Sequence, residues 1–186
     1  MSLEEIKNKL DYITNTIRQN LDVNNSQTRM CKESSLHVLK LCERLDIPYI
    51  PFSMGELGMP ELEHHFGITG FQTEEYGQIC FLIDLTYIQF TEKKYYINVK
   101  DKSEEKLSLS PGNFISDENK NNLLQNGYLI LTEETFNDYL GCFIEANKLA
   151  NKIDEQKIYQ KAHILLKKFG INFAEEDYLN NRTVKR

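Results

Sequence analysis

Residues 77–85 read Gly77-Gln78-Ile79-Cys80-Phe81-Leu82-Ile83-Asp84-Leu85, and this stretch decides the fold class. It is apolar at almost every position from Ile79 onward, which predicts a strand with both faces buried. Such a strand lies in the interior of a sheet rather than at its edge. Asp84 comes at the end of the apolar run. A carboxylate there must be paired or hydrogen-bonded to stay charged.

Segments with a helical pattern precede and follow this strand in the sequence. Ser2 and Glu5 form a capping box, and apolar residues then recur every three or four positions up to Leu21. The sequence predicts further helices over 31–45, 117–126, 133–149 and 154–169, and further strands over 63–69 and 94–99. Residues 49–60 and 101–113 are expected to be loops. Helices, then strands, then helices is the order of an α+β fold.

The chain has 186 residues, which is the length of one ordinary domain. We divide this single domain into an N-terminal helix, a core that carries the candidate chemistry, a helical C-terminal part and a tail. Their expected ranges are 1–21, 25–100, 111–170 and 171–186.

The charge pattern and the lengths of the apolar runs exclude nucleic acid and a membrane as partners. The net charge is −6 and the basic residues are scattered, whereas a nucleic-acid binder needs a basic face. The longest apolar run is far too short to span a membrane. The acidic start of the chain does not resemble a signal peptide, so we expect a cytoplasmic location, or export without a conventional signal. The sequence does not indicate an oligomeric state.

Cysteine supplies the first candidate for chemistry. The four cysteines show no C-x-x-C spacing, so we expect free thiols, no metal site and no cofactor. Cys31 begins a predicted helix and shares its apolar face with Ser35, Val38 and Cys42. The partial positive charge of a helix N-terminus favours thiolate over thiol, so Cys31 is a candidate nucleophile. Cys42, three turns further on, is expected to be a core residue.

A cysteine nucleophile also needs a base, and the base needs an orienting group. His64 and His65 are adjacent in a predicted strand, so they face opposite sides of it. His64 shares its side with Phe66 and Ile68, which favours His64 as the base, while His65 remains the alternative. Asp84 on the neighbouring strand is the candidate that orients the imidazole.

The order Cys31, His64, Asp84 resembles the papain-like, transglutaminase-like cysteine fold. His64-His65-Phe66 resembles its His-x-aromatic motif, and Leu82-Ile83-Asp84-Leu85-Thr86 its apolar-apolar-Asp-x-Thr motif. The longer stretch 82–90, which ends in Gln89-Phe90, resembles bacterial toxin and effector glutamine deamidases. The resemblance implies a helix carrying the cysteine packed on an antiparallel sheet, and a protein or peptide as the substrate.

The same resemblance implies a donor for the oxyanion. The papain family has a glutamine shortly before the nucleophile; Asn25 stands at that spacing here, and Gln27 is closer to Cys31. Either amide could act with the Cys31 N–H, and Gln89 is a candidate for substrate binding. Glutamine deamidation is the expected reaction, with proteolysis and transglutamination as alternatives. A protein-binding module that kept the fold without activity is the rival interpretation.

Overall fold

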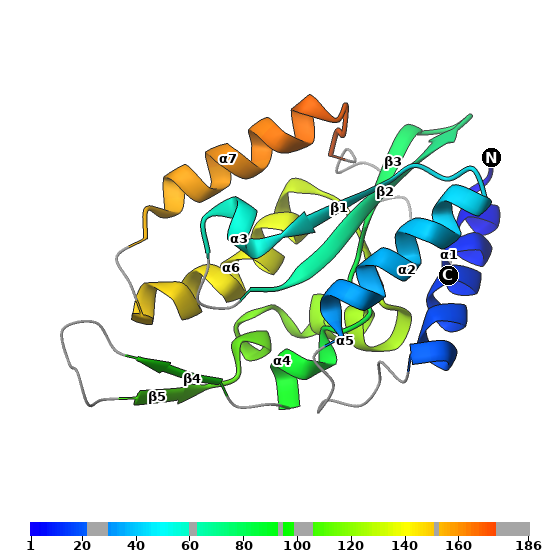
Figure 1. The fold of residues 1–186 in the computed structure, drawn as a ribbon. Helices are drawn as coiled ribbons and strands as arrows, with labels where there is room; N and C mark the ends of the chain where they lie inside the picture. The colour runs from blue at the N-terminus through cyan, green and yellow to red at the C-terminus, as the bar shows by residue number, and fades with distance from the viewer. Residues whose placement is uncertain (22–29, 60–62, 93–94, 99–105, 151–152, 174–186) are drawn as a thin grey trace.

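The computed structural model describes residues 1–21, 30–59, 63–92, 95–98, 106–150 and 153–173. Within these ranges the chain is α+β, with seven α-helices, a four-stranded antiparallel sheet and a separate two-stranded sheet (Figure 1). The helices are α1 (Leu3–Leu21), α2 (Cys31–Arg44), α3 (Met54–Leu57), α4 (Ile88–Glu92), α5 (Asp117–Asn126), α6 (Glu133–Ala150) and α7 (Glu155–Lys168). The strands are β1 (Tyr49–Ser53), β2 (His65–Thr73), β3 (Gly77–Ile83), β4 (Tyr95–Asn98), β5 (Lys106–Leu109) and β6 (Tyr128–Ile130). A 3-10 turn, η1, spans Pro111–Phe114.

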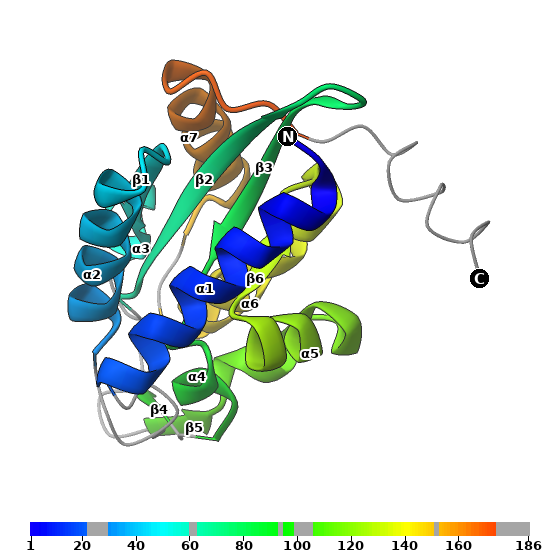
Figure 2. The same cartoon turned by 90° about the vertical axis from the view of Figure 1, so that its right-hand side faces the viewer.

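The larger sheet has the strand order β1-β2-β3-β6, so β3 is an interior strand as its sequence predicts. Alternate residues of β3 enter two different cores. Ile79, Phe81 and Ile83 pack with α1 and α2, whereas Cys80 and Leu82 pack with α6 and α7. The fold is therefore a three-layer arrangement in which helices cover both faces of the sheet (Figures 1 and 2).

The helix boundaries follow from their caps. Ser2 and Glu5 exchange hydrogen bonds at the start of α1, and Ser116 and Asp154 accept backbone N–H groups at the starts of α5 and α7. Gly127 ends α5 with a φ of 79°, a conformation that costs glycine little. None of the described helices is long and apolar enough to cross a bilayer.

Residues 49–60 were expected to be an irregular loop because of their prolines and glycines, and this prediction is wrong. They contain β1 and α3. Pro51 is tolerated because β1 is an edge strand, where a missing N–H group need not break the ladder. Ser53 and Glu56 form a capping box that begins α3.

Other strand predictions also need correction. β2 begins two residues later than expected and continues to Thr73, because it forms a hairpin with β3. The strand predicted over 94–99 is present as β4, but its partner β5 lies in a segment expected to be a loop, so that part of the loop prediction is wrong. β6 was not predicted as a strand. Its three residues are too few for an alternation pattern, and pairing with β3 makes it a strand.

Candidate active site

Cys31 is the first residue of α2, and its side chain is half-buried. The residue before it, Met30, makes no side-chain hydrogen bond to cap the helix. The helical ladder begins only where Ser34 N–H donates to the Met30 carbonyl, at 2.8 Å. The first-turn N–H groups therefore lie at the same end of α2 as Cys31, where their partial positive charge favours a thiolate.

A hydrogen bond one turn into α2 positions this helix on the sheet. Ser35 Oγ lies 3.0 Å from the Tyr49 hydroxyl of β1, and it donates to the Phe66 carbonyl of β2 at 3.5 Å. The Tyr49 ring crosses over Gly67, where a Cβ atom would lie only 2.1 Å from it. Gly67 thus provides the space that lets Tyr49 reach α2, the helix that begins with Cys31.

His64 and Asp84 meet because of the register of the hairpin. His64 immediately precedes β2, Asp84 immediately follows β3, and Gly67 is opposite Ile83 in the antiparallel pair. The start of one strand therefore lies beside the end of the other. His64 Nε2 is 2.6 Å from Asp84 Oδ2, and both side chains are completely buried. The strand alternation predicted this pairing for His64 rather than His65.

Three further donors hold the Asp84 carboxylate. Oδ1 accepts the Thr86 backbone N–H at 3.1 Å and the Thr86 hydroxyl at 3.3 Å. Oδ2 accepts the Tyr139 hydroxyl at 2.9 Å in addition to His64. A buried carboxylate with four donors is hydrogen-bonded on both oxygens, as burial of a charge requires.

Two aromatic rings enclose the His64 imidazole. Phe90 meets it edge-on with ring centroids 4.5 Å apart, and Phe143 stacks on it at 5.5 Å with an interplanar angle of 9°. Nδ1 is buried and makes no hydrogen bond within the described part of the chain. Since Asp84 occupies Nε2, Nδ1 is the nitrogen left to exchange a proton with Cys31.

The pKa values of Cys31 and His64 depend on each other and on the charge of Asp84. Burial alone would lower the pKa of His64, but the charge and hydrogen bond of Asp84, together with Cys31, outweigh it and raise this pKa to about 9. Burial alone would raise the pKa of Cys31, but His64 and a hydrogen bond from the His65 backbone lower it below its ordinary value. The pair therefore favours a thiolate beside an imidazolium.

The remaining sequence candidates are placed differently. The His65 side chain is 23% exposed and its Nε2 lies 3.6 Å from Glu63 Oε1, whereas His64 is the histidine that pairs with Asp84. Burial lowers the pKa of His65. Gln89 is buried in α4, beside Phe90, and α4 lies at the same end of the molecule as the start of α2 (Figures 1 and 2). Asn25 and Gln27 lie outside the described residues.

Sequence reasoning missed Tyr139 and Phe143. Both lie on the apolar stripe of α6, one turn apart, and both are fully buried. One signal was present in the sequence, since a tyrosine within an apolar stripe must find a partner for its hydroxyl. The sequence did not show that this partner would be Asp84, because the two residues are separated by 55 positions.

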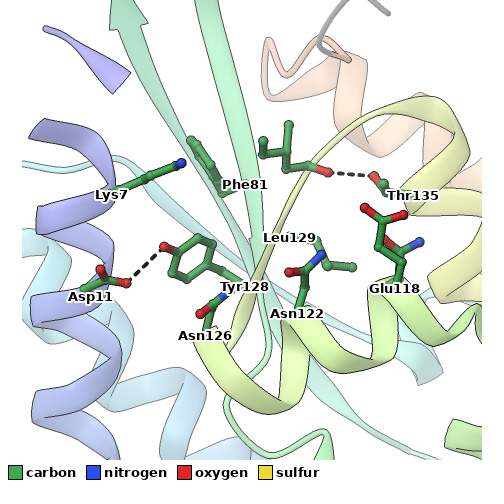
Figure 3. Close-up of a pocket in the computed structure, with 11 residues that line it drawn as sticks. Lys7, Asp11, Phe81, Glu118, Asn122, Asn126, Tyr128, Leu129 and Thr135 are labelled. Atoms are coloured by element: carbon green, nitrogen blue, oxygen red, sulfur yellow. Dashed lines mark hydrogen bonds between the residues drawn. The ribbon is translucent and has the colours of Figure 1, made fainter. Parts of the chain in front are cut away.

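A hollow of about 310 Å³ lies between α1, α5 and β6. Figure 3 shows Lys7 and Asp11 on one side of it and Glu118, Asn122 and Asn126 on the other. This hollow and α2 lie on opposite sides of α1 (Figure 2), so it is separate from the cysteine site. No histidine or cysteine lines it, and the described residues contain no cluster that could hold a metal ion.

Comparisons of the chain with family models, curated protein sequences and solved structures find no match. The class of protein therefore rests on the geometry of Cys31, His64 and Asp84 and on the fold that brings them together.

Proposed function

We propose that this protein is a cysteine-dependent acyl-transfer enzyme that acts on a carboxamide of a protein or peptide. One observation carries the proposal. His64 is bound through Nε2 to Asp84 at 2.6 Å, is coupled electrostatically to Cys31, and leaves a buried Nδ1 for proton transfer. A nucleophile, a base and an orienting group in this order are the parts that covalent catalysis by a thiol requires.

The reaction begins when the Cys31 thiolate attacks the carbonyl carbon of the carboxamide and forms a tetrahedral intermediate. His64, protonated at Nδ1, gives its proton to the departing nitrogen, and ammonia leaves as the thioester forms. Water then attacks the thioester; neutral His64 takes one proton from it, and the carboxylic acid is released with the thiolate restored. Asp84 holds the imidazole in one orientation and stabilises its charged form throughout.

The start of α2 supports the oxyanion of this intermediate. The Cys31 N–H belongs to the first turn of α2, where N–H groups have no partner within the helix, so under this proposal it donates to the developing negative charge. Under this proposal the second donor is an amide, for which Asn25, Gln27 and Gln89 are the candidates. A preorganised donor of this kind contributes about 3 kcal/mol to transition-state stabilisation in hydrolases.

Within the α+β class, the arrangement of the elements supports a papain-like, transglutaminase-like fold. A helix that begins with the cysteine packs on an antiparallel sheet, and neighbouring strands supply the histidine and the aspartate. Glutamine deamidation is our preferred reaction, on the resemblance of the Asp-x-Thr and Gln-Phe motifs to bacterial toxin and effector deamidases. With an amine in place of water the same thioester gives transglutamination, and with a peptide bond as substrate the same steps give proteolysis.

Thiol reactivity tests the proposal without knowledge of the substrate. The protein is treated with iodoacetamide at pH 6, and the labelled cysteines are identified by mass spectrometry. Cys31 should react faster than a model thiol, and His64→Gln should slow it to the rate of that thiol. The other cysteines are internal controls because all three are buried, and burial raises the pKa of Cys42, Cys80 and Cys142.

If Cys31 reacts no faster than the model thiol, the enzyme proposal is wrong and a protein-binding module is the better interpretation. If it is reactive, ammonia release from glutamine peptides and candidate proteins identifies deamidation. Incorporation of a fluorescent amine identifies transglutamination, and new peptide termini identify proteolysis.

A further inference from the structure

We infer that Tyr139 of α6 is a positioning residue for the proposed reaction, because its hydroxyl holds the Asp84 carboxylate in the orientation that binds His64. This inference rests on the proposed function and extends its machinery to the C-terminal helical part of the chain. Tyr139 lies 55 positions after Asp84, so the contact depends wholly on the packing of α6 against the sheet.

The contact is specific to one oxygen of Asp84. Tyr139 donates to Oδ2 at 2.9 Å, and this is the same atom that His64 Nε2 approaches at 2.6 Å. Thr86 holds the other oxygen through its N–H and hydroxyl. With a donor on each side, the carboxylate cannot rotate about its bond to Cβ without breaking hydrogen bonds in a region from which water is excluded.

Tyr139 and Phe143 contact the two members of the Asp84–His64 pair. They are one helical turn apart on α6, so they present their rings to the same surface. Tyr139 holds Asp84, while Phe143 stacks on the His64 ring, and their own rings lie 5.4 Å apart. A single helix thus sets the position of both the imidazole and the carboxylate.

Two other buried tyrosines show that burial alone does not require a carboxylate as the partner of the hydroxyl. Tyr87 is fully buried beside Tyr139, yet its hydroxyl donates to the Gly112 carbonyl at 3.0 Å. Tyr49 pairs with Ser35. Both hydroxyls are satisfied without a charged group, so Tyr87 offers a matched control for the loss of one buried hydroxyl.

Charged and titratable groups from several elements interact electrostatically with His64 or Asp84. Besides Tyr139 these are Arg18 of α1, Cys31 of α2, Tyr49 of β1, His65 of β2, Tyr87 and Cys142. Tyr139→Phe leaves all of them in place and removes only one donor from Asp84. Without this donor Asp84 is no longer held in the orientation that binds His64, so its interaction with the imidazolium weakens and the pKa of His64 should fall.

The test compares Tyr139→Phe with Tyr87→Phe. Both variants lose one buried hydroxyl, so both should melt at a lower temperature. The ¹⁵N shifts of the His64 ring, followed from pH 5 to 11, should show a lower midpoint only in Tyr139→Phe. The pH midpoint of Cys31 alkylation should rise by about one unit in Tyr139→Phe, which lowers the rate about tenfold at a pH below both midpoints.

If both variants lower the melting temperature equally and leave the His64 titration unchanged, Tyr139 is only structural and the inference is wrong. If Tyr139→Phe does not fold, 3-fluorotyrosine placed at position 139 keeps the hydroxyl and provides a ¹⁹F signal. That signal should shift as His64 titrates near pH 9, whereas fluorotyrosine at position 87 should not; equal responses would also overturn the inference. A wild-type Cys31 that lacks enhanced reactivity refutes the proposed function instead, because the His64 titration reports on Tyr139 without any activity.

Discussion

His64 Nε2 and Asp84 Oδ2 lie 2.6 Å apart in the interior of the protein, and neither side chain is exposed to solvent. A charged pair in this environment is stable only because other groups complete its hydrogen bonds. Thr86 and Tyr139 do so for the carboxylate, while Phe90 and Phe143 exclude water from the imidazole. The pair is therefore sensitive to any change in either partner.

Asp84→Asn should impair both stability and reactivity. The amide group cannot accept from all four donors, and the neutral side chain no longer supports a charged His64. We expect the free energy of unfolding to fall by about 3–5 kcal/mol and turnover to fall about 100-fold or more. Chemical denaturation measures the stability, the alkylation rate of Cys31 measures its reactivity, and an ammonia-release assay measures turnover.

Asp138→Asn is the matched control for this prediction. Asp138 also accepts several hydrogen bonds, from Ser116 and Asn119, but it does not contact His64. It should lower stability and leave the reactivity of Cys31 unchanged. Equal loss of reactivity in both variants would show that Asp84 acts only through stability.

Cys31→Ala should abolish the reaction with little loss of stability, since its half-buried thiol leaves no closed cavity when removed. Cys42→Ala should do the opposite. Cys42 is fully buried among α1, α2 and the sheet, and its truncation should cost on the order of 1 kcal/mol or more. Thermal melts beside an ammonia-release assay, run once a wild-type signal is found, separate the two effects. A fully active Cys31→Ala protein would contradict the proposed nucleophile.

The pH dependence of turnover should differ from that of alkylation. Both should fall in acid as the Cys31 thiolate, whose pKa is lowered, becomes protonated. Above about pH 9 His64 loses its proton and can no longer protonate the leaving nitrogen, so turnover should fall again. Alkylation needs no such acid and should stay at its plateau. A turnover rate that keeps rising beyond pH 10 would argue against His64 as the acid.

Gly67→Ala should disturb the site from a distance. The new methyl group would overlap the Tyr49 ring, displace it from Ser35 and loosen α2 on the sheet. We expect a loss of about 1–3 kcal/mol from this overpacking and slower alkylation of Cys31. Gly70→Ala in the same strand is the control, because its Cβ would lie 3.3 Å from the Cys80 sulfur, a far smaller overlap. Equal alkylation rates in the two variants would show that Tyr49 does not position Cys31.

Local sequence determined the longer helices and the choice between the two histidines. Ser116 and Asp154 each cap the helix that the periodicity predicts, because capping and amphipathic spacing act within one or two turns. Alternation along the strand predicted over 63–69 put His64 on the side of Phe66 and Ile68, and the structure places all three in or against the same core. That core also contains the rings that enclose His64. These features depend on neighbours in the chain, so the sequence was sufficient.

The short strands and the environment of Asp84 depended on tertiary structure. β1 contains a proline and β6 has only three residues, and each is a strand because a longer neighbour supplies its hydrogen bonds. Tyr139, Phe143 and Gly67 contribute to the site through contacts between segments distant in the chain. The pattern of a helix shows which face is buried but not what it is buried against, because many apolar surfaces satisfy the hydrophobic effect equally well. The hydroxyl of Tyr139 reaches its acceptor, Asp84 Oδ2, only because α6 packs against the face of the sheet formed by β2 and β3.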